Sequence, residues 1–351
     1  MKYIAPRWLP GGQLQTIWPT LYSRRAFGPK PQYRRERWDT PDGDFIDVDF
    51  LVDGSPGTCT GTGTGTGSGT PAPQPLLVVF HGLEGSSRSH YGEAFADFAR
   101  EHGWACALPH FRGCSGEINR APRAYHSGDH AEIGWILQRL RAAHTGPLVA
   151  VGVSLGGNAL LRWAAEVGDD AARSVDAVAA VCSPIDLAAG GHAIGRGFNR
   201  QVYTRMFMRT LVPKALQKLA QHPGLFDRQA LLAARDLYAF DNVFTAPVHG
   251  FRNTEDYWLR ASSKPMLHRI RVPALVVNAR NDPFVPAASL PQAHEVGRCV
   301  TLWQPPNGGH VGFAQGRLPG NVRGMPDAVG GWLANQADIG GWTGAAQSPH
   351  G

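Results

Sequence analysis

Ser154 has the sequence context of a catalytic nucleophile. It lies in Gly152-Val-Ser-Leu-Gly156, directly after the apolar run 148–151, which reads as a strand buried on both faces. The residues from Asn158 onward are good helix formers. A serine at so sharp a strand-to-helix turn is held in a strained backbone conformation, so that only glycine fits two residues before and after it. The pattern predicts a nucleophile elbow, although this short motif also occurs in ordinary loops.

A serine nucleophile needs a histidine base, and the base needs a carboxylate that fixes its tautomer. At an elbow of this kind the acid follows the serine along the chain and the histidine comes last. Asp282 stands in the turn after a strand-like run, and His310 lies in a glycine-rich loop after the next one. Both would then reach the edge of a parallel sheet where catalytic groups collect. We predict a triad of Ser154, Asp282 and His310. The alternatives are that Asp282 merely caps a turn and that His310 is a solvated bystander.

The same chemistry requires two backbone N–H groups that stabilise an oxyanion. One donor belongs to the residue after the nucleophile, here Leu155, and the other to the loop after an earlier strand. The strand-like run 76–80 leads into His81-Gly-Leu-Glu-Gly85. We predict that the amides of Leu83 and Leu155 form the oxyanion hole. His81, just before the glycine turn, is expected to have a structural role, with a role as base as the alternative.

Seven motifs together resemble the α/β-hydrolase superfamily, and more closely its YheT-type hydrolases. They are Gly12-Gln-Leu-Gln-Thr16, Pro41-Asp-Gly-Asp44, His81-Gly-Leu-Glu-Gly85, His110-Phe-Arg-Gly-Cys-Ser-Gly-Glu117, Tyr125-His-Ser-Gly128, Gly152-Val-Ser-Leu-Gly-Gly157 and Gly308-Gly-His-Val-Gly-Phe313. The resemblance spans about residues 8–335. It departs from the family pattern at 54–74 and over the last dozen residues. It implies a serine hydrolase that acts on carboxylic esters through Ser154, Asp282 and His310.

The elements that would position these residues fit that fold. Two runs, 34–38 and 45–52, flank a proline–glycine turn and predict an opening hairpin. Its second strand is expected to be a half-buried edge, because apolar residues alternate there with Asp47 and Asp49. From Leu76 onward strands alternate with helices. This predicts a mostly parallel central sheet with helices on both faces.

The strand pattern disappears between about residues 185 and 265, where helical segments rich in Phe, Tyr, Met and Leu follow one another. We interpret this stretch as a helical cap inserted into one α/β domain, which 351 residues can form. The predicted organisation is a first part of the core at 1–184 with a flexible Gly/Thr-rich loop at 53–75, the cap at 185–265, a second part of the core at 266–337 and a flexible tail at 338–351.

The predicted cap offers two sets of side chains. Candidates for lining an apolar acyl pocket are Phe198, Tyr203, Met206, Phe207, Leu211, Phe240, Phe244 and Trp258. The alternative, which we expect for most of them, is that they pack the cap onto the sheet. The basic residues of the same stretch are Arg200, Arg205, Arg209, Lys214 and Lys218. They predict a solvated helix face, with weak contact to a membrane surface as the alternative.

Composition excludes several other functions. The net charge is +6, but the basic residues are scattered and form neither a base-reading helix nor an RNA-binding aromatic signature, so we predict no nucleic-acid partner. Five cysteines without regular spacing argue against a disulfide framework and for a reducing compartment. Metal-binding motifs and a signal peptide are both missing from the sequence. We therefore expect a cytoplasmic protein without metal or cofactor.

The functional expectation is a serine hydrolase of carboxylic esters with short to medium acyl chains, whose partner is a small-molecule ester. Two alternatives stay open. The acyl-enzyme could pass its acyl group to an alcohol instead of water, or the fold could serve as a binding module with a vestigial triad. Every predicted catalytic position is filled, which argues against the second alternative.

Overall fold

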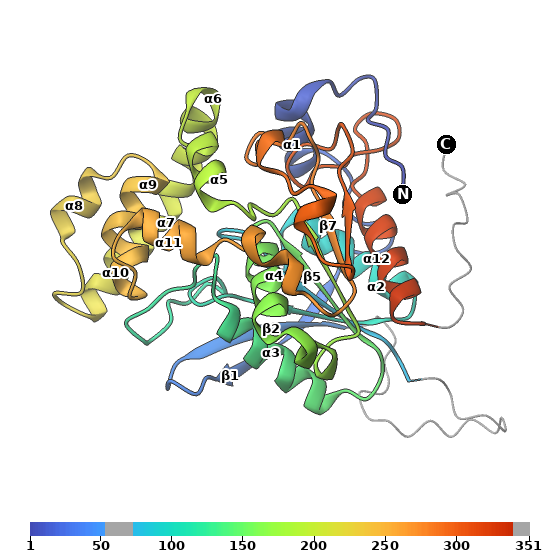
Figure 1. Cartoon of the computed structure of the whole chain (residues 1–351), viewed down its shortest axis with the longest axis horizontal. Helices are drawn as coiled ribbons and strands as arrows, with labels where there is room; N and C mark the ends of the chain where they lie inside the picture. The colour runs from blue at the N-terminus through green and yellow to red at the C-terminus, as the bar shows by residue number, and fades with distance from the viewer. Residues whose placement is uncertain (53–72, 340–351) are drawn as a thin grey trace.

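The computed structural model describes residues 1–52 and 73–339. The predicted Gly/Thr-rich loop therefore lies outside the described residues, apart from 73–75, and so does the predicted tail beyond residue 339. An eight-stranded sheet with the order β1-β2-β4-β3-β5-β6-β7-β8 forms the centre (Figure 1). The strands are β1 (Gln32–Asp39), β2 (Phe45–Val52), β3 (Leu76–Phe80), β4 (Ala105–Pro109), β5 (Leu148–Val153), β6 (Ala177–Val181), β7 (Ala274–Val277) and β8 (Val300–Trp303).

Most neighbouring strands are parallel. The pairs β3–β4, β3–β5, β5–β6, β6–β7 and β7–β8 run parallel, and only β1–β2 and β2–β4 are antiparallel. Helices cover both faces, so the predicted fold class is confirmed. The strand order reverses between β3 and β5, where Phe80 lies opposite Gly152. Ligands bind at such a switch point in open α/β sheets, and the loops after these two strands carry His81–Gly85 and Ser154.

The opening hairpin is confirmed, but its second strand is not the edge of the sheet. β1 occupies the edge, and β2 lies between β1 and β4. Asp47 and Asp49 are also buried, contrary to the half-buried pattern expected for them. They can be buried because arginines of β1 pair with them: Arg37 Nε lies 2.8 Å from Asp47 Oδ1, and Arg35 Nε lies 2.7 Å from Asp49 Oδ1. The alternation of aspartate with apolar residues therefore does not mean that the aspartates face solvent in this strand.

Two hydrophobic cores lie on opposite faces of the sheet. Helices α3 and α4 contribute to one core, and α2 and α12 contribute to the other (Figure 1). The helices of these layers and of the N-terminus are α1 (Gly11–Leu21), α2 (His90–Glu101), α3 (His130–Ala143), α4 (Leu155–Val167) and α12 (Gly324–Gln336). Because every residue of β3 and β5 is buried, the loops that leave their carboxyl ends start from fixed positions.

Between β6 and β7 the chain forms helices and no strand. They are α5 (Leu187–Ile194), α6 (Gly197–Asn199), α7 (Arg205–Gln221), α8 (Arg228–Ala233), α9 (Leu237–Phe240), α10 (Ala246–Val248) and α11 (Thr254–Ala261). A π-helical turn, Arg200–Thr204, joins α6 to α7 without a break. Figure 1 shows these helices gathered to one side of the sheet. Within residues 1–52 and 73–339, no helix combines the length and apolar character that crossing a bilayer requires.

Candidate active site

The turn at Ser154 has the backbone geometry of a nucleophile elbow. β5 ends at Val153 and α4 begins at Leu155, and Ser154 between them has φ 53° and ψ −118°. A Cβ atom on Gly152 would lie 2.5 Å from the carbonyl oxygen of Gly156, and one on Gly156 would lie 2.5 Å from the carbonyl oxygen of His81. Such distances are too short for any side chain, so the flanking glycines are needed for steric reasons.

The structure brings together the three residues predicted as a triad. His310 Nε2 lies 3.0 Å from Ser154 Oγ, and His310 Nδ1 lies 2.8 Å from Asp282 Oδ2. The second oxygen of Asp282 accepts hydrogen bonds from the backbone N–H groups of Phe284, at 2.7 Å, and Val285, at 3.3 Å. The carboxylate is inaccessible to solvent and the His310 side chain is 10% exposed. These contacts orient the imidazole toward the serine, as acyl transfer requires.

The predicted oxyanion donors flank the same serine. Leu155 is the first residue of α4, so its N–H has no partner within the helix. In the loop after β3, the Gly82 N–H donates to the Tyr91 hydroxyl at 2.8 Å and the Glu84 N–H donates to the Tyr125 hydroxyl at 2.8 Å. Among the described residues the N–H of Leu83 between them has no such acceptor. The loop also lies close to the serine, because a Cβ on Gly82 would be 3.1 Å from Ser154 Cβ.

The comparison with known proteins shows the family of the chain. A family model described as the α/β hydrolase fold matches residues 75–316. The chain belongs to the α/β hydrolase family. The matched region contains β3 to β8 and all five residues that were predicted for the site. Both the fold and the family that the sequence motifs indicated are therefore confirmed.

Among α/β hydrolases the chain is of the YheT type. It is 36% identical to YheT of Escherichia coli (strain K12) over 336 residues, which cover 95% of this chain and 93% of YheT. Phospholipase ABHD3 of Mus musculus is 26% identical over 322 residues, 87% of this chain and 75% of ABHD3. The solved structure of Est1E from Butyrivibrio proteoclasticus has the same fold, with a TM-score of 0.50, 14% identity and coverage of 88% and 99% of the two chains.

Ser154 and His310 line a cavity of about 160 Å³. The helices between β6 and β7 supply much of its apolar wall, through Ile194, Phe207, Leu211, Leu237, Phe240, Phe244 and Trp258. Three of the residues proposed for this wall lie elsewhere. Phe198 and Met206 are 53% and 51% exposed, and Tyr203 packs edge-on against Phe284. On α7, Phe207 and Leu211 are the residues that line the cavity, and Met206 is not.

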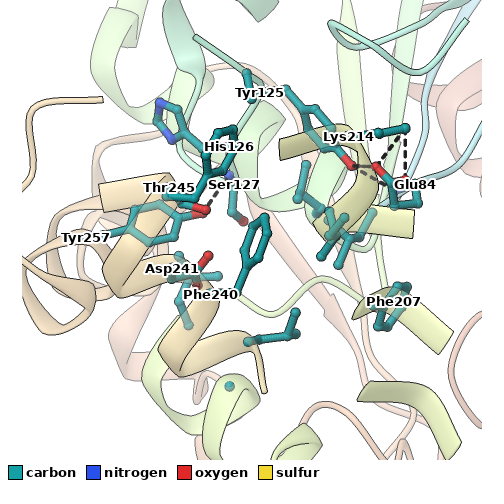
Figure 2. A pocket seen from close by; sticks show the side chains of 18 of the residues that line it. Glu84, Tyr125, His126, Ser127, Phe207, Lys214, Phe240, Asp241, Thr245 and Tyr257 are labelled. Carbon is teal, nitrogen blue, oxygen red and sulfur yellow. Dashed lines mark hydrogen bonds and ion pairs between the residues drawn. The ribbon is translucent and has the colours of Figure 1, made fainter. Parts of the chain in front are cut away.

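One wall of the cavity holds an ion pair between α7 and the loop after β3 (Figure 2). Lys214 Nζ lies 2.8 Å from Glu84 Oε2, and the Tyr125 hydroxyl donates to Glu84 Oε1 at 2.9 Å. The basic helix face expected from the sequence is therefore wrong for two of its members. Lys214 turns into the cavity, and Lys218 is buried and donates to the backbone carbonyl of Ala121 at 2.9 Å.

The far side of the cavity holds a carboxyl group, that of Asp241 (Figure 2). Trp258 Nε1 donates to Asp241 Oδ2 at 2.9 Å. Burial raises the pKa of Asp241 to about 6, while hydrogen bonds from Thr245 and Trp258 act in the opposite direction. Arg112, Asn119, His126 and Lys218 also line the cavity, and most of the remaining wall is aromatic or aliphatic. That part of the cavity suits an apolar chain.

His81 behaves as a neutral structural residue. Its Nε2 accepts a hydrogen bond from the backbone N–H of Phe111 at 3.0 Å, which leaves the proton on Nδ1, 2.7 Å from the carbonyl oxygen of Gly82. Burial lowers the pKa of His81 to about 3. Both ring nitrogens are occupied by the backbone, so this geometry agrees with the structural interpretation and leaves no free nitrogen to act as a base.

One group of side chains in the described part of the chain could in principle hold a metal ion, and it consists of Cys182, Asp282 and His310. Burial raises the pKa of the Cys182 thiol well above its ordinary value, so the thiolate that a metal would need is disfavoured. The thiol instead accepts a hydrogen bond from the N–H of Val311 at 3.2 Å. These atoms are better explained as parts of one hydrogen-bonded site around His310 than as ligands.

Sequence reasoning missed several residues of the site. Glu84, Lys214 and Asp241 line the cavity, yet none of them was predicted to lie there, and Cys182 behind His310 was not singled out. A pairing between a lysine and a glutamate 130 positions apart leaves no local pattern. One signal was present: the motif Gly12-Gln-Leu-Gln-Thr16 supported the family resemblance but had no assigned role.

Proposed function

We propose that this protein is a serine hydrolase that cleaves carboxylic esters through an acyl-enzyme on Ser154. The observation that carries the proposal is the chain of contacts at the elbow, with 3.0 Å from Ser154 Oγ to His310 Nε2 and 2.8 Å from His310 Nδ1 to Asp282 Oδ2. A hydroxyl with an oriented base and a buried carboxylate behind that base is the arrangement that activates serine.

In the proposed reaction, His310 Nε2 takes the proton of Ser154 as Oγ attacks the ester carbonyl carbon. The carbonyl electrons move onto oxygen, where the N–H groups of Leu83 and Leu155 stabilise the negative charge, each by about 3 kcal/mol in the transition state. The intermediate collapses, the alcohol leaves with the proton from His310, and the acyl group stays on Ser154. Water then attacks this acyl-enzyme with His310 as base, which releases the carboxylic acid. Asp282 orients His310 throughout.

We propose esters of short to medium apolar acyl chains as substrates. The support comes from the lining of the cavity, which is mostly aromatic and aliphatic, with Phe207, Leu211 and Phe240 among its residues. The relative ABHD3 is named a phospholipase. This agrees with a substrate whose apolar acyl group is the part that the enzyme recognises.

The test uses a fluorophosphonate probe and p-nitrophenyl esters from acetate to decanoate, with wild type and Ser154→Ala compared side by side. We expect labelling of wild type alone and turnover that peaks at one chain length. Ser154→Ala should unfold within about 1 kcal/mol of wild type, because Ser154 serves chemistry rather than packing. Equal turnover by the variant, or a folded wild type that the probe does not label, would refute the proposal and favour a binding role.

Adding a primary alcohol to the same assay separates hydrolysis from acyl transfer. Hydrolysis yields the free acid at every alcohol concentration, whereas an acyltransferase forms a new ester at the expense of the acid. We expect the free acid to remain the main product.

A further inference from the structure

Helix α1 carries two buried polar side chains, Gln15 and Thr16, which are 2% and 6% exposed. Buried polar groups in a helix are costly unless hydrogen bonds satisfy them. Besides local bonds to Leu9 and Gly12, they have partners 266 to 294 residues further along the chain, in the two loops that carry Asp282 and His310. Neither residue touches Ser154, and the mechanism proposed above does not use them.

Gln15 connects the two loops. Its Oε1 accepts hydrogen bonds from the backbone N–H of Gly308 at 2.8 Å and from Asn281 Nδ2 at 2.9 Å. Asn281, next to Asp282, in turn accepts the N–H of Gly309 on its Oδ1 at 3.0 Å. The Nε2 group of Gln15 is anchored on the Leu9 carbonyl oxygen at 2.8 Å. One amide side chain thus ties the acid-bearing loop to the histidine-bearing loop.

Thr16 holds the histidine itself. Its Oγ1 accepts the hydrogen bond of the His310 backbone N–H at 2.9 Å and donates to the Gly12 carbonyl oxygen at 2.7 Å. The loop around His310 is rich in glycine and has no regular secondary structure. Its backbone N–H groups therefore need acceptors from elsewhere, and α1 provides the acceptors for Gly308 and His310.

The backbones also approach one another closely. A Cβ atom on Gly12 would lie 1.9 Å from the Asn281 carbonyl oxygen, and one on Gly312 would lie 1.8 Å from the Gln15 carbonyl oxygen. No side chain fits at either position, so α1 sits directly against both loops. Packing at this range leaves the loops little room to shift.

The same helix reaches the segment between β6 and β7. The Tyr203 hydroxyl donates to Gln13 Oε1 at 2.6 Å, and Gln13 Nε2 donates to Asn199 Oδ1 at 2.8 Å. Asn199 Nδ2 then donates to the Pro283 carbonyl oxygen, directly after Asp282, at 2.6 Å. Three residues of α1 therefore contact the surroundings of the triad from separate directions.

We propose that Gln15 and Thr16 are positioning residues. They hold His310 and Asp282 at the distance and orientation from Ser154 that catalysis needs, so that α1 completes the active site. This inference rests on the proposed hydrolysis. A displacement of about 1 Å in a catalytic group costs on the order of 100-fold in rate. Loss of the Thr16 acceptor should therefore slow the chemical step more than it weakens substrate binding.

The test compares Thr16→Val with Thr16→Ser. Valine keeps the shape of threonine and removes the acceptor, and we expect kcat to fall about 10- to 100-fold with KM within about twofold. Serine keeps the hydroxyl and should restore kcat to near the wild-type value. The matched control is Thr20→Val on the same helix. In the described part of the chain, Thr20 Oγ1 bonds the Thr16 carbonyl oxygen, at 2.9 Å, and neither triad loop. The kcat of this control should stay unchanged. A Thr16→Val enzyme with wild-type kcat would overturn the proposal.

A second measurement follows the hydrogen bond between His310 and Asp282 without any turnover of substrate. We expect the proton between His310 Nδ1 and Asp282, whose heavy atoms are 2.8 Å apart, to give a separate low-field NMR signal. Thr16→Val and Gln15→Met should shift or broaden this signal, while Thr20→Val and Thr16→Ser should leave it in place. If that signal and the fluorophosphonate labelling rate are the same in all variants, the positioning role is wrong even though hydrolysis stands. If wild type is not labelled, hydrolysis is wrong, and the NMR signal alone then decides whether α1 sets the geometry of His310.

Discussion

Ser154 has a strained backbone conformation that its neighbours hold in place. Its positive φ of 53° costs on the order of 1–3 kcal/mol and persists only where the surroundings determine the backbone. Here the Ser154 N–H is bound to the Val181 carbonyl oxygen at 2.8 Å, and the Ser154 carbonyl accepts from Gly157 at 3.0 Å. The strained serine thus stands between a buried strand and the first turn of a helix, and both hold it in place.

Asp241 allows a prediction at the same scale. Burial raises its pKa to about 6, so the folded protein binds this proton more tightly than the unfolded chain does. The resulting contribution to the free energy of unfolding is present at low pH and is lost as pH rises through about 4 to 6. Asp241→Asn keeps an acceptor for Trp258 and carries no charge. At pH 7.5 we expect this variant to be more stable than wild type, by at most about 3 kcal/mol.

Urea unfolding of both proteins at pH 4.5, 6.0 and 7.5 checks this expectation. The stability advantage of Asp241→Asn should shrink toward pH 4.5, where the wild-type carboxyl is protonated as well. An advantage that stays constant over the three pH values would mean that the carboxyl of Asp241 is not the titrating group.

At the scale of elements, the ion pair between Lys214 on α7 and Glu84 connects the helices over the cavity to the oxyanion loop. Glu84 directly follows Leu83, and its side chain is only 9% exposed. The Tyr125 hydroxyl both donates to the Glu84 carboxylate and accepts its backbone N–H. A change in the position of α7 would therefore move Glu84, which is the residue next to the proposed oxyanion donor Leu83.

Lys214→Met tests that connection. The change leaves the Glu84 carboxylate without its cation, and since Lys214 is partly exposed we expect a loss of about 1–2 kcal/mol in stability. We also expect kcat for p-nitrophenyl esters to fall about tenfold, since a single oxyanion donor supports more than that. Arg209→Met, an exposed change on the same helix, is the control and should alter neither quantity. A normal kcat together with lowered stability would show that the ion pair stabilises the fold and has no part in catalysis.

At the scale of the whole molecule, the surface of the helices between β6 and β7 bears on the alternative of weak membrane contact. Phe198, Val202 and Met206 are 53%, 36% and 51% exposed. Spaced four residues apart on one continuous helical segment, they share a face. Arg205 and Arg209 on the same segment are exposed as well. An apolar stripe beside cations is the surface that an anionic bilayer attracts.

We propose weak binding to vesicles that contain anionic phospholipid, measured by co-sedimentation at low and high salt. Binding should fall when the ionic strength rises, because the arginine contribution is screened. A double variant, Phe198→Ser with Met206→Ser, should bind less and keep wild-type turnover of a water-soluble ester, since neither residue lines the cavity. No binding of wild type at low salt would show that this face is simply solvated.

The fold and the candidate triad could be anticipated because their signals are local. Gly152, Ser154 and Gly156 form a short motif that, directly after an apolar run and before helix-forming residues, is typical of a sharp strand-to-helix turn. Buried parallel strands read as apolar runs, and the residues at their carboxyl ends follow directly in the sequence. Asp282 and His310 each stand in such a place, and a parallel sheet brings their loops to one edge. The mostly parallel sheet and the family were confirmed for these reasons.

The burial and pairing of individual side chains had no such signal. The pairing of Lys214 with Glu84, the burial of Asp47 and Asp49 by arginines, and the exposure of Phe198 and Met206 depend on which surfaces meet after folding. A charged side chain has the same sequence pattern whether it faces water or a partner across the cavity. The expectation of a solvated face was wrong for Lys214 and Lys218, and that of a half-buried edge strand was wrong as well, because exposure was inferred from residue type.

The sequence by itself thus determined the sheet, the elbow and the order of the proposed catalytic residues, because strand periodicity and turn sterics act over a few residues. Only the tertiary structure decided that α1 lies against the loops of Asp282 and His310 and that α7 reaches the oxyanion loop. Those placements depend on burial and hydrogen bonding between segments that are 130 to nearly 300 residues apart, and interactions over such separations leave no periodic trace in the chain.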